Sequence, residues 1–474
     1  MNFILKFPIT ASMRGFTTLL ITCLCIITIS CKTDDKAPVP TQNIVMLAQG
    51  NSNLTSLVSA LSRFPDLVAT LSGSGTFTVF APSNQAFTTL LTATGQTSLD
   101  NIPDDVLKKI LQYHVVSTAA LRSNQLTAGN VNTAVGENIV VTTSGGLKLN
   151  STVSVTTADV AASNGVVHII DAVLVNPSIV PIVGTIVAPA YFNKSFTTLI
   201  AAVNAASPSI LTTLLNSSKK TLFAPTNDAF VAAGITTLPD RATLDAVLTY
   251  HVLNSEVRAA SLPSNTAPAN SAVTTLNGVF YLSNRGATGV FINGRTKVTQ
   301  TDIIASNGTV HVINRTLLPP SQTIAQIATS LSTSASSPQF TQLVAALGRV
   351  NELLTAASSP SSNLTVFAPT DAAFQALYKA LGVNGINDID LTTLTNVLKQ
   401  HIVSSPTTTT GRVFSTDLVS AAVPTLNGNV TINATSGTVT SSSGTIATIS
   451  SNTGLVNVLG TNGVIHTIDK VLIP

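Results

Sequence analysis

Hydrophobic and polar residues follow two kinds of pattern along this chain, and the same pair of patterns occurs three times. Apolar residues spaced three and four apart, as on one face of a helix, occur over 54–61, 196–203 and 340–347. Short alternating runs separated by Gly turns follow later in each repeat, for example over 130–175, and are typical of antiparallel strands. Each repeat therefore predicts a helical part followed by a sheet.

One motif, Phe-Ala-Pro-Ser/Thr-Asn/Asp-x-Ala-Phe, marks the same point in every repeat. Its copies begin at Phe80, Phe223 and Phe367, so the spacings are 143 and 144 residues (223 − 80 and 367 − 223). This period is the size of a domain, whereas solenoid repeats have about 20–50 residues. The motif predicts a strand that stops at Pro and a helix that begins after a Ser or Thr cap, with the second Phe pointing into the core. Its candidate residues are Phe80, Pro82, Asn84, Phe87, Phe223, Pro225, Asn227, Phe230, Phe367, Pro369, Asp371 and Phe374.

The six histidines follow the same period, two in each repeat. The first of each pair ends a helical pattern, after Tyr113, Tyr250 or Gln400. The second follows an Asn-Gly pair, which favours a tight hairpin turn because both residues tolerate positive φ. The histidines are His114, His168, His251, His311, His401 and His466.

A structural role suits these histidines better than a metal site. His168 alternates with Val166 and Ile170, so it is expected on a buried strand face, with its ring nitrogens hydrogen bonded to neighbours. A zinc site needs three or four ligands. Each repeat offers two histidines, no cysteine, and no acidic residue at a position shared by all three copies. No metal is therefore expected.

The three motifs, in this order and three times over, resemble the fasciclin domain. The resemblance covers nearly all of residues 43–474. It implies an α+β fold of three tandem modules, each a compact β-sandwich or wedge with a helical layer. It also implies secreted or surface-anchored modules of adhesion and matrix proteins, without enzymatic activity or a cofactor. In animal members the Tyr-His segment has been linked to integrin contact. Tyr113-His114 and Tyr250-His251 preserve this segment and Gln400 replaces the tyrosine in repeat 3. A bacterial origin argues against integrin as the natural partner, so no binding residues are carried over.

The repeats predict domains at 41–177, 179–319 and 321–474, the third of them divergent. Short Pro-containing joins between them restrict φ, so a semi-rigid row of modules is expected. No serine stands in a nucleophile-elbow context, and no phosphate-binding loop or recurring carboxylate pair is present, which agrees with a protein that is not an enzyme.

The first 30 residues have the pattern of a secretory signal, with basic residues before an apolar run over 16–29. The run is shorter than the ~20 residues that span a membrane. It ends at Cys31, in a context that resembles a bacterial lipoprotein cleavage site, although Thr28 stands where such sites usually carry Leu. Residues 31–40 form an acidic tether similar to the tag of some Bacteroidetes lipoproteins. An ordinary solvated tether is the alternative. We expect a lipid on Cys31 and an outer-membrane location facing the cell exterior.

Composition narrows the choice of partner. Charged residues make up 9% of the chain, the formal net charge is +3, and no Lys/Arg cluster is present, which argues against nucleic acid. All three cysteines, Cys23, Cys25 and Cys31, precede the repeats, so no disulfide is expected in the mature chain. The chain has no Trp and five Tyr, a small supply of rings on which sugars stack.

We therefore expect an adhesion or interaction protein with an unidentified protein or glycan ligand at the cell surface, attached to the membrane only through the N-terminal lipid. The alternative is a glycan-binding accessory lipoprotein of a polysaccharide-capture system.

The anchor is tested by Cys31→Ser. Because the lipid is expected on the Cys31 sulfur, the variant should leave the membrane fraction or remain as an unprocessed precursor of larger mass. Membrane fractionation and gel mobility measure these two outcomes. A variant that fractionates and migrates like the wild type would show that Cys31 carries no anchor.

Overall fold

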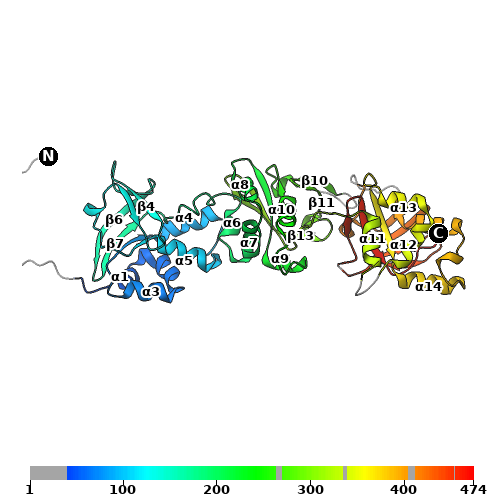
Figure 1. Ribbon diagram of the computed structural model, residues 1–474, viewed down its shortest axis with the longest axis horizontal. Helices are drawn as coiled ribbons and strands as arrows, with labels where there is room; N and C mark the ends of the chain where they lie inside the picture. The colour runs from blue at the N-terminus through cyan, green and yellow to red at the C-terminus, as the bar shows by residue number, and fades with distance from the viewer. Residues whose placement is uncertain (1–39, 263–269, 335–338, 404–410, 453) are drawn as a thin grey trace, which may run out of the picture.

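The computed structural model describes residues 40–262, 270–334, 339–403, 411–452 and 454–474. Three domains lie in a row, with domain 1 at one end and domain 3 at the other (Figure 1). The predicted signal segment, Cys31 and all but the last residue of the predicted tether lie outside the described residues.

The helices and strands of domain 1 build one sheet with helices against it, and the sheet order is β2-β1-β7-β6-β5-β4-β3. In chain order its elements are α1 (Ile44–Gln49), α2 (Thr55–Ser62), α3 (Pro65–Ser72), β1 (Phe77–Pro82), α4 (Asn84–Thr94), α5 (Asp104–Tyr113), β2 (Val115–Val116), β3 (Gly129–Asn132), β4 (Asn138–Thr142), β5 (Lys148–Leu149), β6 (Val153–Ala162) and β7 (Gly165–Ile170).

Domain 2 repeats this arrangement, with the sheet order β10-β11-β12-β13-β14-β8-β9. Its elements are α6 (Ala188–Tyr191), α7 (Thr197–Ala205), α8 (Pro208–Leu215), β8 (Lys220–Pro225), α9 (Asn227–Ala232), α10 (Arg241–Tyr250), β9 (Val252–Leu253), β10 (Ser271–Thr275), β11 (Gly278–Asn284), β12 (Val290–Ile292), β13 (Thr296–Ala305) and β14 (Gly308–Ile313).

Domain 3 has an eight-stranded sheet in the order β20-β19-β18-β17-β16-β15-β22-β21. Its elements are α11 (Ile324–Ser332), α12 (Thr341–Arg349), α13 (Asn351–Ser358), β15 (Leu364–Pro369), α14 (Asp371–Leu381), α15 (Leu391–Gln400), β16 (Ile402–Val403), β17 (Ala421–Thr425), β18 (Gly428–Asn433), β19 (Thr438–Thr440), β20 (Ile446–Thr448), β21 (Val458–Gly460) and β22 (Gly463–Ile468). The predicted α+β fold of three tandem modules is confirmed.

Each sheet buries apolar side chains on both of its faces. In domain 1, Phe77, Val79 and Ala81 of β1 belong to a core shared with the helices, whereas Phe80 of the same strand belongs to a second core within the β part. This division follows from the period of two along a strand. The first strand of each domain is therefore buried from both sides, and its residues are mostly apolar, with one buried Thr in each strand and Lys220 at the start of β8.

The first and last strands of each domain pair in parallel, which closes the domain on itself. β1 pairs with β7, β8 with β14, and β15 with β22. The other strands of the sheet and the helices after the motif lie between the two members of the pair in sequence, whereas the first three helices of each domain precede it. In domain 1 the register places Phe80 beside His168, and these two rings stack with centroids 5.6 Å apart.

The Asn-Gly pairs lie at tight hairpin turns, as the sequence predicts, but their asparagines do not adopt the expected positive φ. The β6–β7 hairpin closes between Ala162 and Gly165, and Asn164 does not have a positive φ. Instead, the Asn164 side chain accepts from the Ile44 N–H (3.0 Å) and donates to the carbonyls of Leu71 and Gly73 (both 2.8 Å).

The glycine of the pair is required by close packing. A Cβ on Gly165 would lie 2.2 Å from the Phe77 carbonyl oxygen of the neighbouring strand. Gly308 and Gly463 meet the same obstacle in domains 2 and 3, at 2.0 and 2.3 Å. The tight turn is therefore present, but positive φ is not what its asparagines supply, and the pair serves to join the ends of the domain.

The strand of the Phe-Ala-Pro motif ends at Pro, as predicted. Pro82 is the last residue of β1 and pairs with Ile170, although β1 lies between two neighbours. Alternate residues of β1 direct their backbone nitrogens toward β2. The two residues of β2 pair only with Thr78 and Val79, so β2 offers no carbonyl acceptor opposite Pro82. A proline at this point therefore loses no hydrogen bond.

The helix that follows the motif begins as predicted. Ser83, Thr226 and Thr370 each accept a hydrogen bond from the backbone N–H three residues later, at 3.2 or 3.3 Å. The second Phe of each motif is buried, as expected: Phe87, Phe230 and Phe374.

Domains 1 and 2 share one continuous apolar core. Residues 176–187, where a short join was expected, run in turns that bury Ile179, Ile182 and Ile186 between the two domains. The buried Gln96 side chain donates to the Pro189 carbonyl at 3.0 Å, where α4 meets α6 (Figure 1). The first junction is therefore packed rather than an exposed linker.

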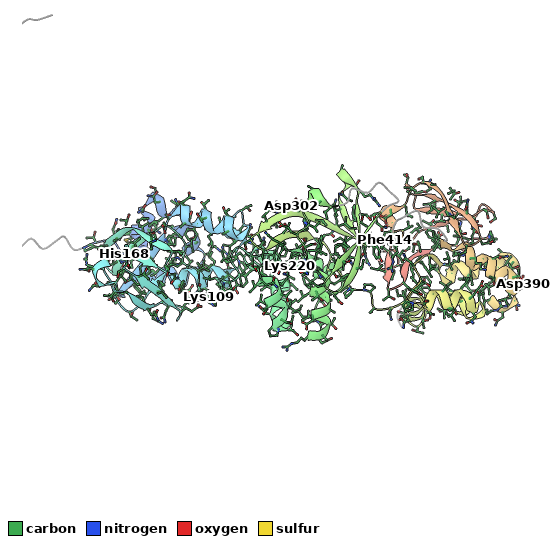
Figure 2. The ribbon with its side chains drawn as sticks, turned by 90° about the horizontal axis from the view of Figure 1, so that it is seen from above. Lys109, His168, Lys220, Asp302, Asp390 and Phe414 are labelled. Atoms are coloured by element: carbon green, nitrogen blue, oxygen red, sulfur yellow. The ribbon has the colours of Figure 1, made fainter. Side chains whose placement is uncertain are left out.

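Domains 2 and 3 meet around one buried carboxylate. Asp417 has no exposed surface and accepts hydrogen bonds from Asn270 (2.6 Å), Ser283 (2.5 Å) and Arg285 (2.5 Å) of domain 2. Only 11% of the Arg285 side chain is exposed. Phe414 lies at the same junction (Figure 2).

Replacing Asp417 by Ala should weaken this junction by about 3–5 kcal/mol, because Arg285 is left as a buried charge without its partner. Urea unfolding of the full chain, with hydrogen exchange of the amides in 270–285, measures the effect. Asp228→Ala, at an exposed position of α9, is the matched control and should change little. Equal stability of Asp417→Ala and this control would show that the carboxylate does not hold the two domains together.

Candidate functional site

The first histidine of each repeat lies at the C-terminal end of a helix and ties it to the last segment of the domain. His114 caps α5, contacts the Ile110 carbonyl through Nδ1 (2.8 Å), and accepts from the Leu174 N–H at Nε2 (2.8 Å). Because Nε2 is an acceptor, the proton is on Nδ1 and the ring is neutral. His251 and His401 make the same pair of bonds, to Val247 and Leu317 and to Val397 and Leu472.

Burial keeps these three rings neutral. It lowers the pKa of His114, of His251 and of His401 to about 4, although a backbone hydrogen bond to each ring acts in the opposite direction. A histidine with such a pKa does not change its charge near neutral pH, so these three do not act as proton donors there.

The second histidine of each repeat has the opposite tautomer. His168 accepts from the Asp159 N–H at Nδ1 (3.3 Å), so Nε2 carries the proton and donates to the Leu121 carbonyl (2.9 Å). His311 repeats this with Asp302 and Val257. Asp159 and Asp302 have positive φ, in a stretch where the register of the strand pair shifts. This irregularity points their N–H groups at the histidines.

Repeat 3 departs from this scheme at one atom. His466 Nε2 contacts the Val413 carbonyl at 2.8 Å, but the buried Nδ1 has no hydrogen-bond partner. Asn457 has the positive φ of Asp159 and Asp302. Its side-chain oxygen accepts from the Ser415 N–H, as Asp159 does from Ser123, and its amide also donates to the Gly294 carbonyl of domain 2 at 2.8 Å.

The tyrosines before the first histidines lie inside the β part. Tyr113 and Tyr250 have no exposed surface, and their hydroxyls donate to the carbonyls of Asn138 (2.7 Å) and Val279 (2.9 Å). Gln400 reaches the corresponding carbonyl of Asn429 at 2.9 Å. The substitution in repeat 3 therefore keeps the hydrogen bond, and none of these side chains reaches the surface.

The polar residue of the Phe-Ala-Pro motif joins two helices. Asn84 accepts from the Ser56 N–H (2.9 Å) and donates to the Ser52 carbonyl (2.9 Å), which links α4 to the start of α2. Asn227 does the same with Thr198 and Lys194. Asp371 accepts from the Gln342 N–H at 2.8 Å.

The polar side chains of the repeated residues thus bond to backbone groups of their own domain and do not converge on a shared ligand site. Within the described residues, no three His, Cys, Asp or Glu side chains lie together as metal ligands would. A small apolar cavity adjoins the first histidine of each domain, with volumes of about 20, 20 and 30 Å³. One water needs roughly 10–15 Å³, so these cavities are too small for a substrate.

The residues at the domain junctions lie outside the repeated motifs, so the sequence analysis did not identify them. Asn270 and Arg285 lie in repeat 2 and Asp417 lies in repeat 3, and they have no periodic counterparts that would attract attention. A comparison of repeats would have found a signal for Arg315. The second histidines are 143 residues apart (311 − 168), so the counterpart of Arg315 is Ala172.

The comparison with protein families agrees with this geometry. The fasciclin domain model matches residues 52–176, 194–319 and 338–474, which is most of the chain. The chain therefore belongs to the fasciclin-domain family.

Individual relatives come from bacteria and animals. The Synechocystis protein sll1483 is 41% identical over 134 residues, which are 28% of this chain and 73% of that protein. Rabbit transforming growth factor-beta-induced protein ig-h3 is 30% identical over 70% of this chain and 45% of its own length. Human periostin is 29% identical over 64% of this chain and 34% of its own. The chain thus spans less than half of these two animal relatives.

One solved structure, a FAS1 domain pair from the insect cell adhesion molecule fasciclin I, aligns with 59% of this chain and 97% of its own. The identity is 20% and the TM-score is 0.28.

No single helix in the described residues has the length and apolar character to cross a membrane. Two neighbouring helical segments, Lys194–Ala205 and Pro208–Leu215, reach that length and apolar character only when they are taken together, and the bend between them is 119°. In this structure α7 and α8 contribute Leu199, Val203 and Leu214 to the core.

His251→Ala should destabilise domain 2 by about 2–4 kcal/mol, because it removes two backbone hydrogen bonds and leaves a hole. Urea unfolding of the full chain measures the change. Faster hydrogen exchange at the Leu317 amide, whose acceptor is the His251 ring, assigns it to this site. Val231→Ala, at an exposed position of the same domain, is the control.

The difference between wild type and His251→Ala should also depend on pH. The ordinary pKa of 6.5 falls to about 4 on folding, so the unfolded chain binds more protons between these values. The contribution of His251 to the free energy of unfolding is then complete above pH 6.5. It declines as the pH falls toward 4, by about 3 kcal/mol in all. A stability difference that is small at pH 7, or that does not shrink on acidification, would contradict the structural role.

Proposed function

We propose that this chain is a lipid-anchored adhesion or interaction protein of the cell surface. Residues 1–30 act as a lipoprotein signal, Cys31 carries the lipid, and residues 31–40 form the tether, in the manner of Bacteroidetes lipoproteins. The protein is held in the outer membrane and faces the cell exterior. It binds a protein or glycan partner there without catalysing a reaction.

The observation that carries this proposal is the row of three fasciclin domains with bonded junctions. A shared apolar core joins domains 1 and 2, and the Asp417 cluster joins domains 2 and 3. The first described residues belong to domain 1, at the end of the row opposite domain 3 (Figure 1). A lipid before domain 1 would therefore hold domain 3 farthest from the membrane, as a projecting adhesion module requires.

The partner must contact surfaces other than the repeated motifs, since Tyr113, Tyr250 and the histidines are buried. The large apolar residues that are exposed lie in all three domains and are aliphatic or Met, for example Leu276, Leu426 and Val231. Scattered residues of this kind are usual on a protein surface. The partner is thus recognised largely through the polar surface of the domains.

The described aromatic residues support adhesion over the glycan-capture alternative. Tyr378 is 3% exposed. The Tyr191 ring packs edge-on against Phe192 with centroids 5.3 Å apart. Tyr281 lies between Phe414, with ring centroids 5.6 Å apart, and the Arg412 guanidinium, 4.8 Å from its ring centre. The Tyr378 and Tyr281 rings are thus covered by protein neighbours, which leaves few rings on which a sugar could stack.

The proposal is tested by displaying the full chain on a bacterial host that processes lipoproteins. Cells carrying the chain should be retained several-fold better on surfaces coated with matrix proteins than cells carrying Cys31→Ser, because only anchored protein links the cell to the surface. Cleavage of the chain by protease added to intact cells reports that it faces outward.

A glycan array separates the two candidate functions. Retention on protein coatings with no array signal supports adhesion through a protein partner. Binding to polysaccharides alone would replace adhesion by glycan capture. Equal retention of the wild type and Cys31→Ser on every coating would contradict both.

A further inference from the structure

A cleft of about 180 Å³, lined by both polar and aliphatic side chains, lies between domains 2 and 3, beside the hydrogen bond from Asn457 to Gly294. Domain 2 lines it with Arg295, Arg315 and Thr316, and domain 3 closes it with Asn457 and the residues that follow. The cleft is much larger than the roughly 10–15 Å³ that one water needs. It therefore has room for a polyatomic ligand.

The two arginines in this cleft lack countercharges. Both are partly buried, and within the described residues neither guanidinium forms an ion pair or a hydrogen bond. The Nε of Arg295 and the hydroxyl of Thr316 are fully buried donors without an acceptor. By contrast, Arg285 and Arg412 at the same junction are bonded to Asp417 and to the carbonyls of Gly460 and Thr461.

The surroundings of Arg295 and Arg315 disfavour the charged form of both side chains. Burial lowers the pKa of Arg295, and the positive charge of Arg315 lowers it further. Burial also lowers the pKa of Arg315. Two partly desolvated like charges without a negative partner favour the entry of an anion.

Domain 1 has no counterpart of this pair. By the 143-residue offset between the second histidines, Arg295 and Arg315 correspond to Thr152 and Ala172 of domain 1, whereas domain 3 has Lys470 at the position of Arg315, four residues after its second histidine. Domain 1 thus folds without arginine at either position. The chain has only 23 Lys and Arg in 474 residues, so two of them in one cleft without an acidic neighbour call for an explanation other than packing.

We propose that this cleft binds an oxyanion, a carboxylate, sulfate or phosphate group, between Arg295 and Arg315. The planar guanidinium presents paired N–H donors that match the oxygens of such groups, and partial burial strengthens the contact. Thr316 supplies a further donor. Because both domains line the cleft, a bound anion also stabilises the junction. This site does not depend on the adhesive role.

The test is thermal unfolding of the full chain in mild detergent at constant ionic strength, with chloride replaced stepwise by sulfate, phosphate, acetate or glucuronate. The wild type should show a saturable rise in Tm with at least one of these anions. Arg295→Gln and Arg315→Gln should each weaken the apparent affinity at least tenfold. Arg241→Gln, at an exposed position of α10, controls for general salt effects and should respond like the wild type.

The behaviour of the variants in chloride alone distinguishes a binding site from a structural pair. Removing one of two like charges should leave the Tm unchanged or raise it. A lower Tm in chloride for both variants would show that the arginines stabilise the fold, and would overturn the proposal. A saturable response that persists in both variants, or a wild type that responds to none of the four anions, would also overturn it. The anion that raises the Tm most identifies the chemical group that the cleft binds. A larger rise with glucuronate than with acetate indicates an acidic sugar.

Discussion

The parallel pairing of the first and last strands is the constraint on which each domain depends. A parallel pair needs a long connection, and here the connection contains all the other strands of the sheet and the helices that follow the motif. The pair packs so closely that only glycine fits at Gly165, Gly308 and Gly463, against the neighbouring carbonyl. The residues repeated three times in this chain surround this pair: the Phe-Ala-Pro motif is its first strand, and the second histidine lies in its last.

The histidines follow from that constraint. One ties the end of a helix to the segment after the last strand, and the other ties the last strand to a loop, through opposite tautomers of a neutral ring. A buried polar ring is tolerated where both of its nitrogens are bonded, and only His466 leaves one nitrogen without a partner. The repetition of these residues thus reflects folding, and it leaves the search for function to the surfaces and junctions.

The two junctions differ in physical character. Domains 1 and 2 share apolar side chains, whereas domains 2 and 3 meet through a buried carboxylate with several donors. Charged groups need specific partners when they are buried, so the second junction fixes one geometry. Beside it, Arg295 and Arg315 remain without such partners, and this contrast at a single interface marks the cleft as a candidate site.

The sequence by itself determined the three repeats, the α+β class, the caps of the helices after the motif and the burial of the phenylalanines and histidines, because these depend on local spacing and apolar periodicity. It did not determine the role of the Asn-Gly pairs. Local propensity favoured a positive-φ turn, but the contacts of Asn164 with Ile44 and Leu71 are 120 and 93 residues distant in sequence. Only the tertiary structure decided these contacts, the Asp417 cluster and the arginine cleft, since each joins residues whose proximity no local pattern encodes.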